Sequence, residues 1–356
     1  MIKKENNNYD YSNLGLKLVD QMDQLTFNRI GEKSIKNINS NQKNLHYGKS
    51  ISNLKERIGS FDNSIIIAAG PSIKREDPIS AILKNNFKGK IVTTESGLYY
   101  CLKNKLIPDL IVTIDPHESR IVRWFGNPNL SEEELKNDDY YRRQDMDEAF
   151  SNEKKVNEDL INLIDKNCKG VPIALSTASS KAVVDRVVSV GMDIYWFNPM
   201  LDDPDIKNSH TMAAHLLNKL PCINCGGNVG TAAWMILDEV LKAKRVALTG
   251  VDFSYYSDTS YVQTQYYNDA LAIFGEENLD NFFIKVHNPY LNKDFFTDPA
   301  YLWYKNAFLE LVKDGSSETY NCTNGGILFG DGISFIELKE YIKLCTNFNA
   351  NNLKVN

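Results

Sequence analysis

Long apolar runs and leader-like segments are missing from this sequence. No stretch is long enough to span a bilayer, and residues 1–8 lack the apolar core of a signal peptide. We therefore expect a cytoplasmic protein with no transmembrane segment. Positive charge is also in short supply, because 46 Asp and Glu outnumber 40 Lys and Arg and leave a net charge of −6. This balance argues against a general nucleic-acid binder, but it is compatible with a local basic pocket for one phosphorylated metabolite.

Two glycine-rich phosphate-binding signatures are also absent. The sequence has no GxxxxGK[ST] loop, which argues against a P-loop NTPase, and no GxGxxG, the usual dinucleotide fingerprint. Asp-x-Asp pairs, which can hold a divalent metal on a nucleotide-sugar, occur only at 145–147 and 203–205. The first lies in a charged segment and the second in an expected turn, so we assign neither to a metal.

The cysteines do not form a metal-binding pattern. Cys222 and Cys225 are close together, but the second ligand pair of common zinc sites is lacking at the familiar separations. The remaining cysteines are scattered and mostly have apolar neighbours. We therefore predict no metal site and reduced, mostly buried thiols at Cys101, Cys168, Cys222, Cys225, Cys322 and Cys345.

Apolar segments alternate with helical patterns through most of the chain. Its 356 residues are 42% apolar and 24% charged, enough for a sizeable core and about two domains. Residues 64–69 (SIIIAA) are typical of a central strand that is buried on both faces. Alternating strands and helices predict an α/β fold, a Rossmann-like, doubly wound, mostly parallel sheet. Strands are expected at 64–69, 90–94, 110–114, 171–176, 192–197, 245–249 and 318–322.

Three segments stand outside this alternation. Residues 1–60 predict an N-terminal helical appendage that packs on the main domain or on another subunit, in a possible homo-oligomer. The Rossmann-like domain is expected at 61–345. Within this domain we predict a charged, solvated helical insertion at residues 128–168, which is also a possible lid over the site. A helical C-terminal part, with helices at 299–312 and 333–344, is followed by an expected disordered tail at 346–356.

Polar clusters follow several predicted strands. Because the carboxyl ends of parallel strands meet at one edge of a doubly wound sheet, we expect these clusters to surround a nucleotide. A glycine turn at a helix start adds free backbone amides for an anionic group. The alternative for each cluster alone is structural: a cap, a turn or loop filling. The clusters are Gly70-Pro71-Ser72, Thr94-Glu95-Ser96, Asp115-Pro116-His117, Gly250-Val251-Asp252 and Gly226-Gly227-Asn228.

Three further side chains suit chemistry on a hydroxyl and a phosphate. His287 lies in a predicted loop before the last long helix, and a histidine near neutral pKa can take a proton from a sugar hydroxyl. Tyr255 and Tyr261 could donate to a phosphate that leaves with the nucleotide. A surface histidine and ordinary aromatic packing are the alternatives.

Several of these motifs resemble one family. The stretch IIAAGPS at 66–72, IPD at 107–109 leading to TID at 113–115, GGNV at 226–229 and LTGVDF at 248–253 occur in the same order in the MptE-like family. That family includes Maf motility-associated glycosyltransferases and archaeal 6-hydroxymethylpterin pyrophosphokinases. Residues 321–326 (NCTNGG) resemble the Maf pattern NATEGG, from which Cys322 and Asn324 depart. The resemblance covers about residues 60–340.

The same features are similar to those of small bacterial sialyltransferases that use CMP-sialic acid. The matching residues are Gly70–Ser72 and the strand end at 250–253. The resemblance implies a nucleotide held by Gly70–Ser72, Glu95–Ser96 and Gly226–Asn228. It also implies a leaving phosphate stabilised by Tyr255 and Tyr261, and His287 as the general base upstream of a Thr-Asp. The spacing between His287 and the Thr-Asp differs from the sialyltransferase pattern. If His287 does not correspond to the sialyltransferase histidine, Asp115 or Asp252 becomes the candidate base.

The resemblances imply a glycosyltransferase of Maf type. It would transfer a nonulosonic, sialic-acid-like sugar from a CMP-activated donor to a protein or glycan hydroxyl, without a cofactor. The first alternative is diphosphotransfer from ATP to a pterin alcohol, with Mg²⁺ held by carboxylates such as Asp115 and Asp252. The second is a non-catalytic nucleotide-binding module.

Overall fold

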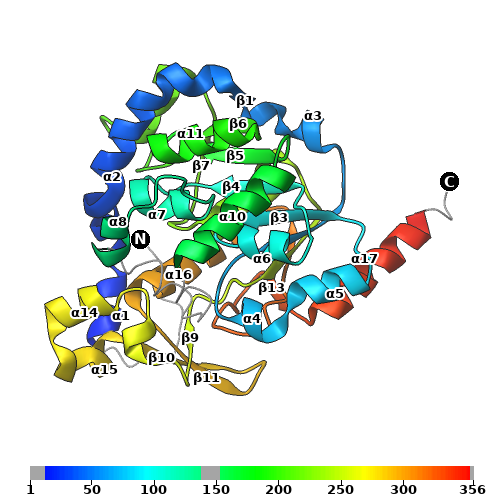
Figure 1. Ribbon diagram of the computed structural model, residues 1–356. Helices are drawn as coiled ribbons and strands as arrows, with labels where there is room; N and C mark the ends of the chain where they lie inside the picture. Colours follow the sequence, from blue (N-terminus) through cyan, green and yellow to red (C-terminus); the bar gives the residue numbers. More distant parts are fainter. Residues whose placement is uncertain (1–12, 138–152, 353–356) are drawn as a thin grey trace.

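The computed structural model describes residues 13–137 and 153–352. A central sheet crosses the molecule in the order β1-β6-β5-β4-β3-β2-β8-β12-β13, with β7 beside β6 (Figure 1). Every neighbouring pair in it is parallel, which confirms the predicted α/β class. The predicted strands are present as β2 (Asn63–Ile67), β3 (Lys90–Thr94), β4 (Leu110–Thr113), β5 (Pro172–Ser176), β6 (Asp193–Pro199), β8 (Arg245–Thr249) and β12 (Glu318–Asn321).

Strand β2 lies at the centre because its isoleucines face both layers of the core. Ile66 packs in the cluster that contains Trp234 and Phe308, on the side of α13 (Val229–Met235) and α16 (Pro299–Asp314). Ile65 and Ile67 pack in the opposite cluster, with α5 (Pro78–Lys84) and α17 (Leu338–Asn352). All three isoleucines are fully buried, as expected for a strand covered by helices on both faces.

The strand order reverses between β2 and β8. From β2 the chain proceeds outward through β3, β4, β5 and β6, and then crosses back to place β8 and β12 on the other side of β2. In open parallel sheets such a reversal leaves a crevice outside the carboxyl ends of the two strands, where ligands bind. The fold therefore places a crevice beyond Ile67 and Thr249, at the turns that the sequence analysis selected.

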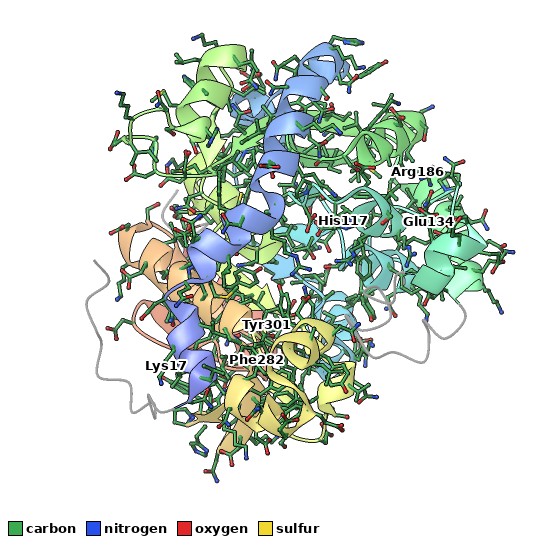
Figure 2. The ribbon with its side chains drawn as sticks, turned by 90° about the vertical axis from the view of Figure 1, so that its left-hand side faces the viewer. Lys17, His117, Glu134, Arg186, Phe282 and Tyr301 are labelled. Atoms are coloured by element: carbon green, nitrogen blue, oxygen red, sulfur yellow. The ribbon has the colours of Figure 1, made fainter. Side chains whose placement is uncertain are left out.

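The N-terminal segment is joined to this sheet more closely than an appendage. Helix α2 (Met22–Asn41) runs along the side of the molecule where β4 and β5 end (Figures 1 and 2). The following strand β1 (Gly48–Ser50), which the sequence did not predict, extends the sheet beside β6. The boundary at residue 60 stays a prediction. The other elements of this segment are α1 (Leu14–Val19), η1 (Gln42–Tyr47), η2 (Ile51–Asn53) and α3 (Leu54–Ile58).

The charged segment at 128–168 contains a core helix. Helix α10 (Glu153–Asn167) buries Val156, Leu160 and Ile164 at four-residue spacing, in a cluster with residues of α7 and α11. The prediction of a solvated insertion is therefore wrong for α10. The helix is rich in charged residues, but one of its faces is apolar and packs in the core. Helix α8 (Glu132–Asn137) precedes it. The possible lid falls largely on 138–152, outside the described residues.

The tyrosine-rich segment after β8 is more regular than a loop. Strands β9 (Tyr255–Tyr256), β10 (Ile284–Asn288) and β11 (Lys293–Thr297) form a small antiparallel sheet, at the lower edge of Figure 1. The register sets Phe295 and Phe296 of β11 opposite the two tyrosines of β9. The connecting helices are η5 (Tyr261–Gln263), α14 (Tyr267–Phe274), η6 (Glu276–Asn278) and α15 (Leu279–Phe282).

The last predicted helix begins later than expected. Residues Ile333–Phe335 form the edge strand β13, held by parallel pairing with β12. Helix α17 then runs to Asn352, beyond the expected start of a disordered tail at 346, and 353–356 lie outside the described residues. The remaining elements are α4 (Ser72–Glu76), α6 (Leu98–Lys103), α7 (Glu118–Arg123), α11 (Lys181–Val190), α12 (His210–Asn218), β7 (Cys222–Ile223) and the π-helical turn η4 (Ile236–Val240).

Two further predictions can be compared with the structure. All six cysteines are free thiols, five buried and Cys222 partly exposed, as predicted. Among the described residues, every helix is too short or too polar to cross a membrane.

Candidate functional site

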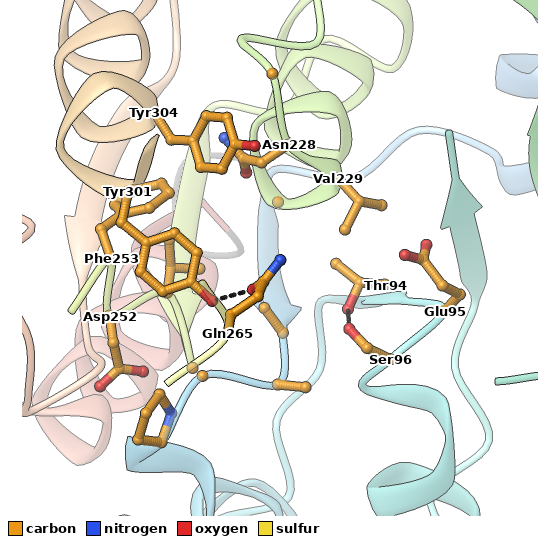
Figure 3. Close-up of a pocket in the computed structure, with 18 of the residues that line it drawn as sticks. Thr94, Glu95, Ser96, Asn228, Val229, Asp252, Phe253, Gln265, Tyr301 and Tyr304 are labelled. Atoms are coloured by element: carbon orange, nitrogen blue, oxygen red, sulfur yellow. Dashed lines mark hydrogen bonds between the residues drawn. The ribbon is translucent and has the colours of Figure 1, made fainter. Parts of the chain in front are cut away.

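A cavity of about 220 Å³ lies at the crevice between β2 and β8. Its walls come from the turns that follow β2, β3, β4 and β8, from the turn before α13 and from the first turns of α16 (Figure 3). Segments far apart in the sequence therefore meet around one hollow. The predicted site residues that line it are Gly70, Pro71, Thr94, Glu95, Ser96, Asp115, Gly227, Asn228, Asp252 and Tyr255.

The other predicted site residues lie outside this lining. Ser72 is buried behind it and bonded to Asp252. His117 is the N-cap of α7, where its Nδ1 accepts from the Arg120 amide at 3.4 Å. Gly226 precedes Gly227, which does line the cavity. The Tyr261 hydroxyl donates to Asp280 at 2.8 Å.

His287 has a different setting from the predicted loop. It lies on β10, where Ile284, Val286 and Asn288 point inward, while Lys285 and His287 point to solvent. Its side chain is 55% exposed, and Nδ1 lies 2.7 Å from Asp294 Oδ1 on the paired strand. The structure does not bring His287 into the cavity wall, so the cavity geometry gives no support to its predicted role as the base.

The turn after β2 is built around Asp252. The Ser72 hydroxyl donates to Asp252 Oδ2 at 2.7 Å, and the Ser72 amide lies 3.3 Å from Oδ1. A Cβ at Gly70 would lie 2.1 Å from Asp252 Oδ2 and 2.6 Å from the Gly250 carbonyl, so this position has room for glycine alone. The Asp252 carboxylate lies on the opposite side of the cavity from Glu95 (Figure 3). Asp252 thus holds two turns together.

The glycine turn before α13 approaches the cavity from a third direction. Gly227 has φ +78°, and a Cβ there would lie 2.3 Å from Trp303 and 2.6 Å from Tyr304 of α16. Asn228 is the N-cap of α13, and its side chain accepts from the Thr231 amide at 2.9 Å. The sequence GGN therefore satisfies a tight local geometry at the cavity wall.

Two carboxyl groups lie at the ends of β3 and β4. Glu95 is 5% exposed, and its Oε2 has no hydrogen-bond partner among the described residues. Burial, with a smaller contribution from the nearby charge of Asp115, raises the pKa of Glu95 to about 8, although hydrogen bonding to its own backbone and to Thr113 acts in the opposite direction. Asp115 Oδ1 accepts from the His117 amide at 2.7 Å. Burial raises the pKa of Asp115, whereas that hydrogen bond and the charges of Arg120, Arg29 and Lys33 lower it.

An aromatic wall that the sequence analysis missed closes the cavity opposite Glu95. Tyr301 and Tyr304, three residues apart on α16, line it together with Gln265, which accepts from the Tyr301 hydroxyl at 2.6 Å (Figure 3). Tyr255 is 4% exposed, and its hydroxyl donates to Asp298 at 3.0 Å. The sequence signal that could have identified this wall is the pair of tyrosines at i and i+3, just after Asp298, the N-cap of α16.

The metal-ligand content of the described residues is low. In residues 13–137 and 153–352, no group of three or more His, Cys, Asp or Glu side chains is placed to hold a metal ion. Mg²⁺ in nucleotide sites needs only one or two carboxylates, because phosphates and waters complete its shell. Asp252, predicted as one Mg²⁺ ligand, is engaged by Ser72. Glu95 and Asp115 fit that requirement better, since both line the cavity and lie near each other.

Comparison with known proteins agrees with the resemblance stated above. Residues 32–129 match the family model of 6-hydroxymethylpterin diphosphokinase MptE-like proteins. Among solved structures, a MAf glycosyltransferase from Magnetospirillum magneticum AMB-1 is similar, with a TM-score of 0.49 and 12% identity. That alignment covers 81% of this chain and 37% of the other, so the present chain spans little more than a third of its length. No curated protein matches.

Proposed function

We propose that this chain, which carries an MptE-like match at 32–129, is a glycosyltransferase of Maf type. It would transfer a nonulosonic, sialic-acid-like sugar from a CMP-activated donor to a protein or glycan hydroxyl. One observation carries the proposal. The segments that resemble Maf and sialyltransferase motifs, at Gly70-Pro71, Gly227-Asn228 and Gly250–Phe253, line the same cavity at the reversal of strand order. The free thiols agree with a reducing, cytoplasmic location.

The Maf-like tail motif also reaches this site. The carbonyl of Asp252 accepts from the Ile327 amide at 2.9 Å, directly after the NCTNGG stretch. A Cβ at Gly326, which has φ +71°, would lie 2.2 Å from that carbonyl oxygen. The motif therefore supports the turn after β8 from behind, which gives a physical reason for two glycines at this place.

The cavity offers distinct partners to the two ends of a nucleotide. The hydroxyls of Thr94 and Ser96, 3.1 Å apart, and Glu95 Oε2, which has no hydrogen-bond partner among the described residues, suit a ribose or base. The turn at Gly227-Asn228 and the aromatic wall of Tyr301 and Tyr304 lie on the other side (Figure 3).

The transfer itself needs a leaving group and a base. The bond between the anomeric carbon and the phosphate oxygen breaks, and CMP departs with the electron pair. The acceptor oxygen bonds to the anomeric carbon, and its proton passes to a base. We assign that base to Asp115 because it lines the cavity, and burial moves its pKa upward from the ordinary range of an aspartate. His287, the first choice from the sequence, has no place in the cavity wall.

A second candidate is favoured by the matched family model. It is named for 6-hydroxymethylpterin diphosphokinase, and the matched residues include Gly70, Glu95 and Asp115. In that reaction a pterin hydroxyl attacks the β-phosphorus of ATP, and AMP leaves. Mg²⁺, if bound, would be held by Glu95 and Asp115 and would neutralise the phosphates.

Ligand-induced thermal stabilisation separates the candidates. A ligand that binds the folded chain at one hundred times its dissociation constant stabilises it by about 2.7 kcal/mol. We expect CMP to raise the melting temperature with and without Mg²⁺. Stabilisation by ATP only with Mg²⁺ would support diphosphotransfer instead. If CMP, CDP, ATP and GTP all leave the melting temperature unchanged, the nucleotide site itself is refuted.

A further inference from the structure

The wall of the cavity, as far as the structure describes it, has acidic side chains but no basic ones. Glu95, Asp115 and Asp252 all line it, whereas its described lining contains no lysine or arginine. A phosphate in such a wall needs positive charge from outside the lining. Helix α2, from the N-terminal segment, crosses the face of the molecule on which His117 and Tyr301 are labelled (Figure 2).

Two asparagines fix α2 on the strand ends. Asn37 Nδ2 donates to the carbonyls of Pro116, at 3.1 Å, and Ala178, at 2.8 Å. Asn41 Nδ2 donates to the carbonyls of Thr177 and Ser179, both at 2.8 Å. These carbonyls belong to the turns after β4 and β5, so α2 is held against the same edge of the sheet that opens into the cavity.

Lys33 and Arg29 continue this strip of the helix toward the cavity. Lys33 lies four residues before Asn37, and Arg29 lies four residues before Lys33, so the three side chains share one face of α2. Lys33 is half-buried, and its ammonium forms no ion pair or hydrogen bond within residues 13–137 and 153–352. The charges of Arg120, Arg29 and Lys33 all lower the pKa of Asp115, and that of Arg29 also lowers the pKa of Tyr304, so they act on two groups of the wall.

The present partners of Arg29 are weak ones. It forms an ion pair with Asp269 at 3.4 Å, and both side chains are more than half exposed. Its guanidinium also lies 6.0 Å from the Tyr266 ring, whose hydroxyl is 3.4 Å from that of Tyr304. Exposed ion pairs of this kind contribute little to stability, so a phosphate can replace Asp269 at little cost.

We propose that Lys33 and Arg29 of α2 form an anion-binding site beside the cavity and hold the phosphate of its ligand. The inference rests on the proposed nucleotide-binding role and adds residues from the N-terminal segment to it. Residues 1–60 then contribute directly to the site. The ligand class is a phosphate ester or diphosphate, because a guanidinium and an ammonium are the protein's strongest phosphate partners.

The test rests on CMP and cytidine, which differ only in the phosphate, with ATP and pyrophosphate as further phosphate-bearing ligands. Calorimetric titrations use CMP, cytidine, ATP and pyrophosphate with the wild-type chain and with Lys33→Gln, Arg29→Gln and the double variant. We expect each single change to weaken phosphate-bearing ligands by about tenfold and to leave any affinity for cytidine unchanged. Lys36→Gln is the matched control, because Lys36 is an exposed lysine of the same helix. Lys33→Arg should restore binding.

The outcomes separate this inference from the proposed function. If CMP binds Lys33→Gln and Arg29→Gln as tightly as wild type, the anion site is refuted and the proposed function stands. A second outcome is that CMP does not bind, whereas ATP or pyrophosphate binds the wild-type chain and binds the variants with lower affinity. The anion site then stands, and the CMP donor is refuted. If none of the phosphate ligands binds the wild-type chain, both are refuted.

Discussion

The Ser72 hydroxyl donates to Asp252 Oδ2 at 2.7 Å across a sequence separation of 180 residues. Both side chains are almost completely buried. This bond joins the turn after β2 to the turn after β8, the two strands between which the sheet reverses its order. The crevice at the switch point therefore has a fixed width, set by a hydroxyl and a carboxylate.

Removal of this hydroxyl should weaken the fold and the site together. We expect Ser72→Ala to lower the free energy of unfolding by about 1–3 kcal/mol, because it leaves a buried carboxylate short of a donor. Urea denaturation of Ser72→Ala, Asp252→Asn and the double variant measures the coupling between them. Additive effects of the two changes would contradict a direct bond.

Gly70 should tolerate no side chain. A methyl group there would approach Asp252 Oδ2 to 2.1 Å, so we expect Gly70→Ala to destabilise the chain by about 1–3 kcal/mol and to abolish nucleotide-induced stabilisation. Gly59→Ala is the comparison for backbone strain without a clash, because Gly59 has φ +80° and open space around it; it should lower stability but keep the stabilisation by CMP. Thermal melts with and without CMP give both readings. Equal behaviour of the two variants would exclude the clash as the cause.

Glu95 should make stability fall as the pH rises. Its pKa is about 8 in the folded chain and near the ordinary 4.5 in the unfolded one, so between these values the folded state holds the extra proton. Raising the pH through this window therefore costs stability, on the order of 5 kcal/mol by pH 9.

The variant Glu95→Gln should remove this slope and be the more stable protein at pH 9. Unfolding free energies at pH 5, 7 and 9 test it, with Glu32→Gln on the exposed side of α2 as the control. Parallel profiles for wild type and Glu95→Gln would show that the Glu95 carboxyl is not buried as described.

The proposed base should be distinguishable from its rival. We expect Asp115→Asn to lower kcat of sugar transfer by about 10²–10⁴-fold while CMP binding persists, because only the proton acceptor is lost. His287→Ala should change kcat by less than about threefold, since His287 lies on an exposed face of β10. The opposite ranking in a product-release assay would return the base role to His287.

The sheet could be predicted because its strands carry a local signal. Ile65, Ile66 and Ile67 are buried on both faces, and such a run of β-branched residues specifies a central parallel strand without reference to the rest of the chain. The turns at Gly70, Glu95 and Asp115 could likewise be placed at one edge, since parallel strands end on the same side.

Elements that depend on distant partners could not be predicted. Strand β1 exists because Gly48–Ser50 pairs with β6, more than 140 residues later. His287 became a strand residue through pairing with β11 rather than through its own neighbours. The charges of Arg29 and Lys33 act on Asp115 because α2 lies across the strand ends, where two asparagines hold it.

The central claim is that this cavity binds a CMP-activated sugar and transfers it. Mass spectrometry after incubation of the chain with a CMP-nonulosonic sugar and cell extract tests it most directly. The account predicts release of CMP matched by an acceptor whose mass has grown by one sugar residue, and loss of both in Asp115→Asn. No such product, with AMP formed instead from ATP and a pterin alcohol, would contradict it.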